Sequence, residues 1–306
     1  MGVYSHLEEF AGLPVGQFSE EITADVPLPP AGEFAWRVSA EYDEAPFEEV
    51  FANFLDAVDT APMTALVVGF WGAGHDDAPD PVPLLAAAAD RFPNLRAIFL
   101  GDIIVYESEI SWIPPCDITP LFDAYPGLER LEVRGNLKLA PVRSEALKVL
   151  RFESGGLPGD VVQAVAASDL PNLEHMDLWL GDPNYGGDAT VADLAPFLNG
   201  ERFPALRHLG LEDSELQDEV AAAVASAPVV ARLESLSLAM GVLTDAGAEA
   251  LLSGQPLTHL RRLDLHHHFL SDPMAARVRA ELPGVDVDLS KQKKPVDDWH
   301  YIAVSE

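Results

Sequence analysis

The chain of 306 residues lacks the cysteine pairs, targeting segments and long apolar runs that define several protein classes. Cys116 is its only cysteine, so no internal disulfide is possible, which favours a reducing compartment. The first residues have neither the basic nor the apolar region of a signal peptide, and His6 stands where myristoylation needs Ser or Thr. No apolar run is long enough to cross a bilayer. We therefore expect a cytoplasmic protein.

Positive charge is also scarce. The chain holds 19 Lys and Arg residues against 50 Asp and Glu residues, for a formal net charge of −31 at pH 7. Such a chain repels phosphate backbones and anionic lipids, and no face rich in Lys and Arg stands out. We therefore expect neither nucleic acid nor membrane as a partner. We interpret the acidity as a solvated surface, with an acidic docking face as the alternative.

Established catalytic motifs are absent from the sequence. It contains no Gly-x-Ser-x-Gly, P-loop, His-Glu-x-x-His or Cys-x-x-Cys pattern. Cys116 follows Pro114 and Pro115, and the sequence shows neither a histidine base for it nor a cause for a lowered thiol pKa, so we predict a structural role. The sequence thus predicts no catalytic residue, no cofactor and no metal ligand.

What the chain does have is leucine, repeated in one frame. In Leu260–Leu270, leucines fall at positions 1, 4, 6 and 11, the strand-and-turn pattern of a leucine-rich repeat. Position 1 recurs through the chain at Leu95, Leu128, Leu147, Leu173, Leu206, Leu233 and Leu260. Position 9 usually holds an inward Asn, but only Asn136 matches. Glycines at this position instead predict tighter turns with left-handed residues.

Most intervals between frames are long enough for a strand and a helix. Helices are expected at 46–59, 79–91, 117–125, 159–168, 189–199, 217–227, 244–253 and 272–281, and further strands at 34–42, 65–71 and 285–289. Because stacked strands are narrower than helices, the stack should bend. The expected fold is α/β, a curved leucine-rich-repeat solenoid (horseshoe) with about nine strands in a parallel sheet on the concave face and helices on the convex face.

Three segments are expected along the chain. Residues 1–33 are proline-containing and show little periodicity, which predicts an irregular N-terminal cap. Residues 34–290 form the repeat solenoid, and residues 291–306 form a C-terminal tail. We expect Tyr301–Val304 to fold back over the C-terminal edge strand, with an exposed docking peptide as the alternative.

Several segments carry a resemblance to a known family: Gly101-Asp102 with Glu109–Ile113, Leu178–Gly181 with Tyr185–Leu194, Asp264–Ser271 and Tyr301–Glu306. Through them the chain resembles a family of bacterial leucine-rich-repeat proteins of the ribonuclease-inhibitor-like class, and the match covers nearly the whole chain. Members of that family tend to be encoded beside radical-SAM and ATP-grasp-like enzymes and have no established activity. The resemblance implies the solenoid fold and hints at a recognition or helper subunit for a modifying enzyme.

Side chains at positions 3, 5 and 7 of each repeat should project from the strands into the concave face. One group of these alternates in charge on adjacent strands: Arg130, Glu132, Arg134, Arg151 and Glu153. We interpret this group as a cross-strand salt-bridge lattice, with a carboxylate-binding patch as the alternative. A second group is His175, Asp177, Trp179, His208 and Glu212. Trp179 either anchors a partner or packs against an overhanging loop, and the sequence leaves both alternatives open.

A third group on this face is Asp264, His266 and His267, with Asp213 near by. In a strand, His266 and His268 face opposite to His267, so the three histidines cannot chelate a metal from one face. We expect His268 to be buried and hydrogen-bonded in place of the usual Asn. A metal site joining more distant residues would have to bridge a strand of small side chains, and no known ligand spacing is present for His208, Glu212, Asp264 and His266.

The sequence therefore predicts a non-enzymatic scaffold that binds a protein or peptide through its concave face. The expected contacts are Arg130, Arg134, Arg151, His175, Asp177, Trp179, His208, Glu212, Asp264 and His266. The alternative is a metal-assisted hydrolase or modifying enzyme, which would bind zinc or iron through His175, Asp177, His208 and Glu212.

Overall fold

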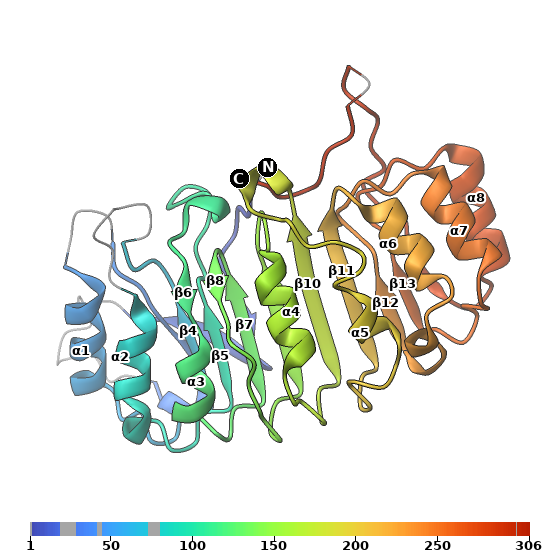
Figure 1. The fold of residues 1–306 in the computed structure, drawn as a ribbon. Helices are drawn as coiled ribbons and strands as arrows, with labels where there is room; N and C mark the ends of the chain where they lie inside the picture. The colour runs from blue at the N-terminus through green and yellow to red at the C-terminus, as the bar shows by residue number, and fades with distance from the viewer. Residues whose placement is uncertain (1, 19–28, 42–44, 73–79, 298) are drawn as a thin grey trace.

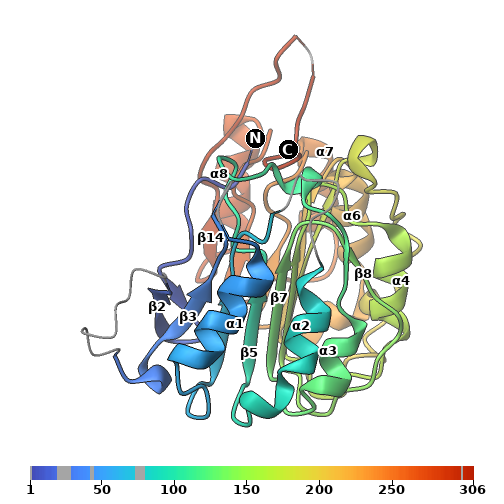
Figure 2. The ribbon, with the colours of Figure 1, turned by 90° about the vertical axis from the view of Figure 1, so that its left-hand side faces the viewer.

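The computed structural model describes residues 2–18, 29–41, 45–72, 80–297 and 299–306. The fold is mixed α/β, with a long, mostly parallel sheet of twelve strands in chain order and helices along one face (Figures 1 and 2). The strands of this sheet are β1 (Glu9–Phe10), β2 (Leu13–Gln17), β3 (Ala35–Val38), β4 (Ala65–Val68), β5 (Ala97–Leu100), β7 (Arg130–Arg134), β9 (Val149–Glu153), β10 (His175–Gly181), β11 (His208–Ser214), β12 (Ser235–Ser237), β13 (Arg262–Asp264) and β14 (Asp286–Asp288). A separate pair comprises β6 (Cys116–Asp117) and β8 (Leu137–Lys138).

Eight α-helices in the described part of the chain match the eight expected segments. They are α1 (Phe47–Ala57), α2 (Pro81–Ala87), α3 (Thr119–Ala124), α4 (Gly159–Ala167), α5 (Ala195–Leu198), α6 (Gln217–Val224), α7 (Asp245–Ser253) and α8 (Asp272–Glu281). Helix α5 is shorter than predicted, because the Asp193 side chain accepts hydrogen bonds from the Thr190 N–H and hydroxyl and holds that segment in a turn. None of these helices is long and apolar enough to span a membrane.

The leucine frame places its side chains between the sheet and the helices. Leu209, Leu236 and Leu263 pair in register on three adjacent parallel strands, β11, β12 and β13, and all three are buried. They belong to one continuous apolar core that runs the length of the sheet. The prediction that position 4 of the frame faces the core is confirmed.

The N-terminal segment differs from the irregular cap that we predicted. Strands β1 and β2 form an antiparallel hairpin, and β2 adds to the sheet beside β3. The connecting residues Ala11 and Gly12 both have positive φ, 53° and 78°, as a type I′ hairpin turn requires. Phe10 then packs edge-to-face on Phe99, on the side of the sheet without helices. Residues 19–28 of the expected cap lie outside the described residues.

The C-terminal tail also differs from the prediction, because it does not cover the edge strand β14. It returns to the carboxyl ends of the central strands, close to the N-terminus (Figure 1). There the Ala303 and Val304 N–H groups donate to the Asp213 carboxylate at 2.9 and 3.0 Å, and Ser111 donates to the carbonyl of Ser305. The edge strand β14 instead carries two acidic side chains, a common protection for a free edge.

The turns after the strands contain left-handed residues, but not always at position 9. Gly181 at position 9 has a φ of 75°, as predicted, and a Cβ there would lie 2.3 Å from the carbonyl oxygen of Gly155. In other repeats the left-handed residue comes one position earlier, at Gly135, Asp213, Met240 and His267. Of the three glycines at position 9, the prediction is therefore confirmed for Gly181 and wrong for Gly155 and Gly241.

The three histidines after β13 lie beyond the strand, which ends at Asp264. We predicted from strand alternation that His266 and His268 face opposite to His267. That argument does not apply, since His267 has a φ of 56° and lies in a turn. His268 is buried, accepts a hydrogen bond from the Leu270 N–H, and donates one to the carbonyl of Leu289. The prediction that His268 is buried and hydrogen-bonded is confirmed.

Candidate functional site on the helix-free face

The face of the sheet opposite the helices, here the helix-free face, carries three rows of side chains. Row 3 is Ala97, Arg130, Val149, His175, His208, Ser235 and Arg262, each paired in register with the next. Row 5 is Phe99, Glu132, Arg151, Asp177, Gly210, Ser237 and Asp264. In row 7, Arg134 pairs with Glu153, and Trp179 pairs with Glu212. The rows expected from the leucine frame are thus present.

Solvent reaches these rows unequally. From Arg130 to Arg262, every member of row 3 is partly or fully exposed. Several members of rows 5 and 7 are buried, including four of the predicted contact residues, Arg134, Asp177, Trp179 and Glu212. Arg151, Asp264 and His266 keep part of their surface in solvent. A partner that docks on this face would therefore meet row 3 and Arg151 first.

Trp179 is buried, with only 5% of its surface exposed. It packs in a small apolar cluster with Ile110, Ala239, Met240 and Val304. Its indole N–H donates to Glu212 Oε2 at 2.8 Å, and the Arg151 guanidinium lies 5.5 Å from the ring centroid. We had left open whether Trp179 anchors a partner or packs against an overhanging loop. The structure shows packing, because the loop with Ile110 and the tail with Val304 lie over position 7.

Below row 3, buried charges form a continuous chain of ion pairs across the sheet. Arg37 of β3 pairs with Asp102 at 3.0 Å, and Asp102 contacts Arg134 of β7 at 3.4 Å. Arg134 pairs with Glu153 of β9 at 2.7 Å, and Glu153 contacts Arg151 at 2.8 Å. The predicted cross-strand lattice is confirmed for Arg134 and Glu153, whereas the pairs Arg130–Glu132 and Arg151–Glu153 each lie within one strand. The chain of ion pairs also includes two residues that we did not predict, Arg37 and Asp102.

The lattice extends to Asp177 of the second group, and its arginines affect the pKa of the carboxyl groups beside them. Arg151 lies 3.5 Å from Asp177, and Arg130 pairs with Glu132 at 2.5 Å. Burial alone would raise the pKa of Glu153, but Arg134 and Arg151 outweigh it and hold this pKa below its usual value. Glu153 is therefore a buried anion whose charge depends on two arginines.

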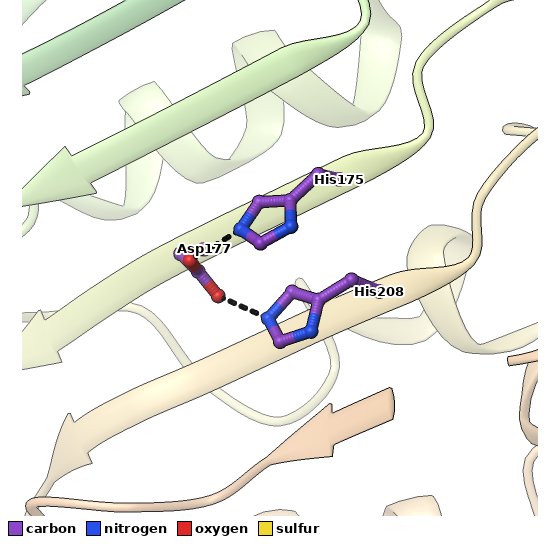
Figure 3. Close-up of side chains that lie close together, drawn as sticks. All are labelled: His175, Asp177 and His208. Carbon is purple, nitrogen blue, oxygen red and sulfur yellow. Dashed lines mark hydrogen bonds and ion pairs between the residues drawn. The ribbon is translucent and has the colours of Figure 1, made fainter. Parts of the chain in front are cut away.

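His175, Asp177 and His208 form a compact polar cluster from two adjacent strands, β10 and β11 (Figure 3). Nε2 of His175 lies 2.7 Å from Asp177 Oδ2, and Nε2 of His208 lies 2.7 Å from Oδ1 of the same carboxylate. The two imidazole rings are stacked, with centroids 4.0 Å apart. Burial acts to raise the pKa of Asp177, but the hydrogen bonds from both histidines lower it well below its usual range.

Glu212 lies in the neighbouring row 7 and behaves differently from Asp177. Its two oxygens accept hydrogen bonds from the Trp179 indole and the Ser237 hydroxyl. Burial, assisted by the negative charge of Asp177, raises the pKa of Glu212 to about 7. This buried carboxyl therefore changes its protonation near neutral pH.

The raised pKa of Glu212 predicts a specific pH dependence of stability. The folded chain keeps this proton where the unfolded chain loses it, so the contribution of Glu212 to stability is lost as pH rises from about 4.5 to about 7. We expect the Glu212→Gln variant to lack this loss, so its unfolding free energy relative to the wild type should increase across that window. Urea unfolding at a series of pH values measures it, and a constant difference between the two proteins would contradict the assignment.

Of the third predicted group, only Asp264 and His266 come together, with a residue that we did not include, Asp288. His267 instead contacts the carbonyl of Tyr301, and Asp213 accepts hydrogen bonds from the tail. His266 Nδ1 lies 2.8 Å from Asp264 Oδ1, and Arg262 contacts both Asp264 and Asp288. Among the described residues, two clusters can offer three ligand atoms within 4.8 Å of one another, namely His175–Asp177–His208 and Asp264–His266–Asp288. The combined site from His208, Glu212, Asp264 and His266, which the sequence analysis considered, is therefore not assembled.

Cys116 lies on the helix side of the sheet, in the main core. Burial raises the pKa of its thiol far above the usual value, and the negative charge of Asp80 adds to this. A thiol in this setting is a poor nucleophile, in agreement with the predicted structural role.

The fold and this face define an α/β protein with a long parallel sheet whose polar face carries an ion-paired lattice. No protein-family model matches the chain, and no curated protein matches it either. A crystal structure of a Bacteroides fragilis protein, from a structural genomics consortium, is similar with a TM-score of 0.80 and 30% sequence identity, over 94% of this chain and 80% of that one. The chain belongs to the same family as this B. fragilis protein, which is uncharacterised and carries no activity over to it.

Proposed function

We propose that the protein is a non-enzymatic binding module that holds an acidic segment of a partner protein or peptide on its helix-free face. The observation that carries this proposal is a partly exposed strip over β7 to β11. It consists of Arg130, Val149, Arg151, His175 and His208. None of these five side chains is acidic, although the chain has a net charge of −31.

The carboxylates of this region lie below the strip. Glu132, Glu153 and Asp177 are buried, whereas the side chains of Arg130 and Arg151 are 39% and 31% exposed. A guanidinium has five N–H donors in a planar fork, and the internal ion pairs use only part of them. The remaining donors suit the carboxylates of an incoming acidic segment.

The lattice also supports binding by holding the strip rigid. Side chains fixed by buried partners lose little conformational entropy when a ligand arrives. The strip ends at β11, because Arg262 on β13 is already surrounded by three carboxylates, Asp264, Asp286 and Asp288. Contacts of a partner with Asp264 and His266 stay a prediction.

We also propose that the chain is a curved leucine-rich-repeat solenoid of the class that its sequence resembles. Two observations support this assignment. The frame leucines pair in register on consecutive parallel strands, and the helices lie in an arc outside the strands (Figure 2). Solenoids of this kind present an extended sheet face to their partners.

The test is affinity capture from cells with matched charge variants. We expect Arg130→Glu to reduce the captured partner roughly tenfold or more, because a charge in the strip is reversed. Arg143→Glu is the control, since Arg143 is exposed and lies on the short segment between β8 and β9. Capture of the same proteins in the same amounts by the wild type and the strip variant would contradict the proposal.

The alternative of a metal-assisted hydrolase or modifying enzyme stays a prediction. Three of its four expected residues, His175, Asp177 and His208, come together, but both oxygens of Glu212 are engaged by Trp179 and Ser237. A role as helper subunit for a modifying enzyme and a location in the cytoplasm are likewise predictions from the sequence.

A further inference from the structure

The cluster of His175, Asp177 and His208 has the donor atoms and spacing of a transition-metal site. Both Nε2 atoms point to one carboxylate (Figure 3), and because the stacked rings are parallel to within 10°, each ring must turn to direct its Nε2 lone pair at a shared ion. One ligand atom from each residue lies within 4.8 Å of the others. Two imidazoles and one carboxylate form a set of three protein ligands that zinc accepts, with a further position left for solvent.

The hydrogen bonds of the cluster indicate which protons must move when an ion binds. A carboxylate only accepts hydrogen bonds, so each Nε2 in the metal-free cluster carries a proton directed at Asp177. To bind an ion, each neutral imidazole moves that proton to Nδ1 and presents the Nε2 lone pair. For His208, Nδ1 lies 2.6 Å from the Ser235 hydroxyl, which then accepts its hydrogen bond and orients the ring.

The strand beside Asp177 leaves space for this arrangement. Gly210 occupies row 5 on β11, and a Cβ there would lie 2.0 Å from Asp177 Oδ1. Its φ is not in the left-handed region, so the glycine is required for room and not for backbone conformation. The His175 side chain is 38% exposed, which gives an ion and its water ligands access from solvent.

The other cluster is a weaker candidate, because an arginine takes the place of an ion. Arg262 Nη2 lies 2.9 Å from Asp264 Oδ2 and 3.3 Å from Asp288 Oδ2, and so neutralises both carboxylates. At the first cluster, Arg151 approaches Asp177 only to 3.5 Å and has its closer partner in Glu153, at 2.8 Å.

We propose that His175, Asp177 and His208 bind one zinc ion per chain on the helix-free face. The site shares His175 and His208 with the strip, but the binding-module proposal depends on the charges of Arg130 and Arg151. Zinc binding by the isolated protein therefore tests this inference without any partner. If the protein did not bind zinc, this inference would be wrong, and the docking proposal would still be tested by affinity capture.

The experiment is a zinc titration of the purified full-length chain, freed of metal by dialysis against a chelator and measured in competition with a chromogenic chelator. We expect one zinc ion per chain. We expect cobalt(II) in place of zinc to give visible ligand-field absorption of a low-coordinate site. His175→Ala and Asp177→Asn should each weaken zinc binding roughly tenfold or more, since even partners of metal ligands contribute that much.

Two matched variants serve as controls. His259→Ala removes a histidine that contacts the carbonyl of Val230, away from the cluster, and His266→Ala disrupts the other cluster, so both should bind zinc as the wild type does. Because His175 is partly exposed, His175→Ala should keep the fold, which thermal unfolding checks. Absence of stoichiometric zinc uptake by the wild type, uptake unchanged in His175→Ala, or loss of uptake in His266→Ala would each overturn the proposal.

Discussion

Leu236→Ala is expected to lower the free energy of unfolding by about 3 kcal/mol or more. Leu236 is fully buried and lies in register between Leu209 and Leu263. Truncation removes its apolar contacts and leaves a cavity that the two flanking strands cannot fill, because their own leucines are fixed by the core. Urea unfolding followed by circular dichroism measures the change as a shift of the midpoint.

Leu216→Ala is the matched control for this change. Leu216 is 39% exposed and stands just before helix α6, so its truncation should cost less than about 1 kcal/mol. If the two variants were equally stable, the leucine at position 4 would not carry the core. The assignment of the helix-free face, which depends on that alternation, would then be wrong as well.

Arg134→Ala is expected to destabilise the protein by about 3 kcal/mol. Arg134 is buried, pairs with Glu153 at 2.7 Å and Asp102 at 3.4 Å, and donates to the carbonyl of Ile103. Removing it leaves two buried carboxylates with one arginine each, so part of their desolvation is no longer compensated. Chemical denaturation at neutral pH measures the loss.

Two further variants separate charge from packing in this experiment. Arg143→Ala removes an arginine that is 71% exposed, and should change stability by less than about 1 kcal/mol. Adding Glu153→Gln to Arg134→Ala removes one uncompensated charge and should restore part of the lost stability. If the double variant were less stable than Arg134→Ala by the full cost of Glu153→Gln alone, the two residues would be energetically independent and the lattice would not act as a unit.

The predicted rows of the helix-free face follow from local rules. Leucines at positions 4 and 6 must face the core, so positions 3, 5 and 7 must face away. Neighbouring frames then place His175 beside His208, and Asp177 beside Gly210, without further information. The repeat length also places α3 to α8, since all but one of the intervals from Leu95 onward have room for a helix, whereas α1 and α2 follow from their own apolar spacing.

The exposure of these residues could not be predicted in the same way. Trp179 is covered by Val304 from the tail and Ile110 from a loop, which are far from it in sequence. The lattice likewise includes Asp102, whose partner Arg37 comes from β3. Alternation along a strand says which face a side chain is on, but says nothing about which distant segment lies over it.

The sequence by itself determined the order of the helices and of the sheet strands from β3 onward, the register of the leucine frame and the identity of the side chains in each row, because all of these depend on residue period and spacing. Only the tertiary structure decided that the N-terminal residues extend the sheet, that the tail is held by Asp213, and that two histidines stack over one aspartate. Those features depend on contacts between residues tens of positions apart, and such contacts are set by the packing of the whole chain and not by any local pattern.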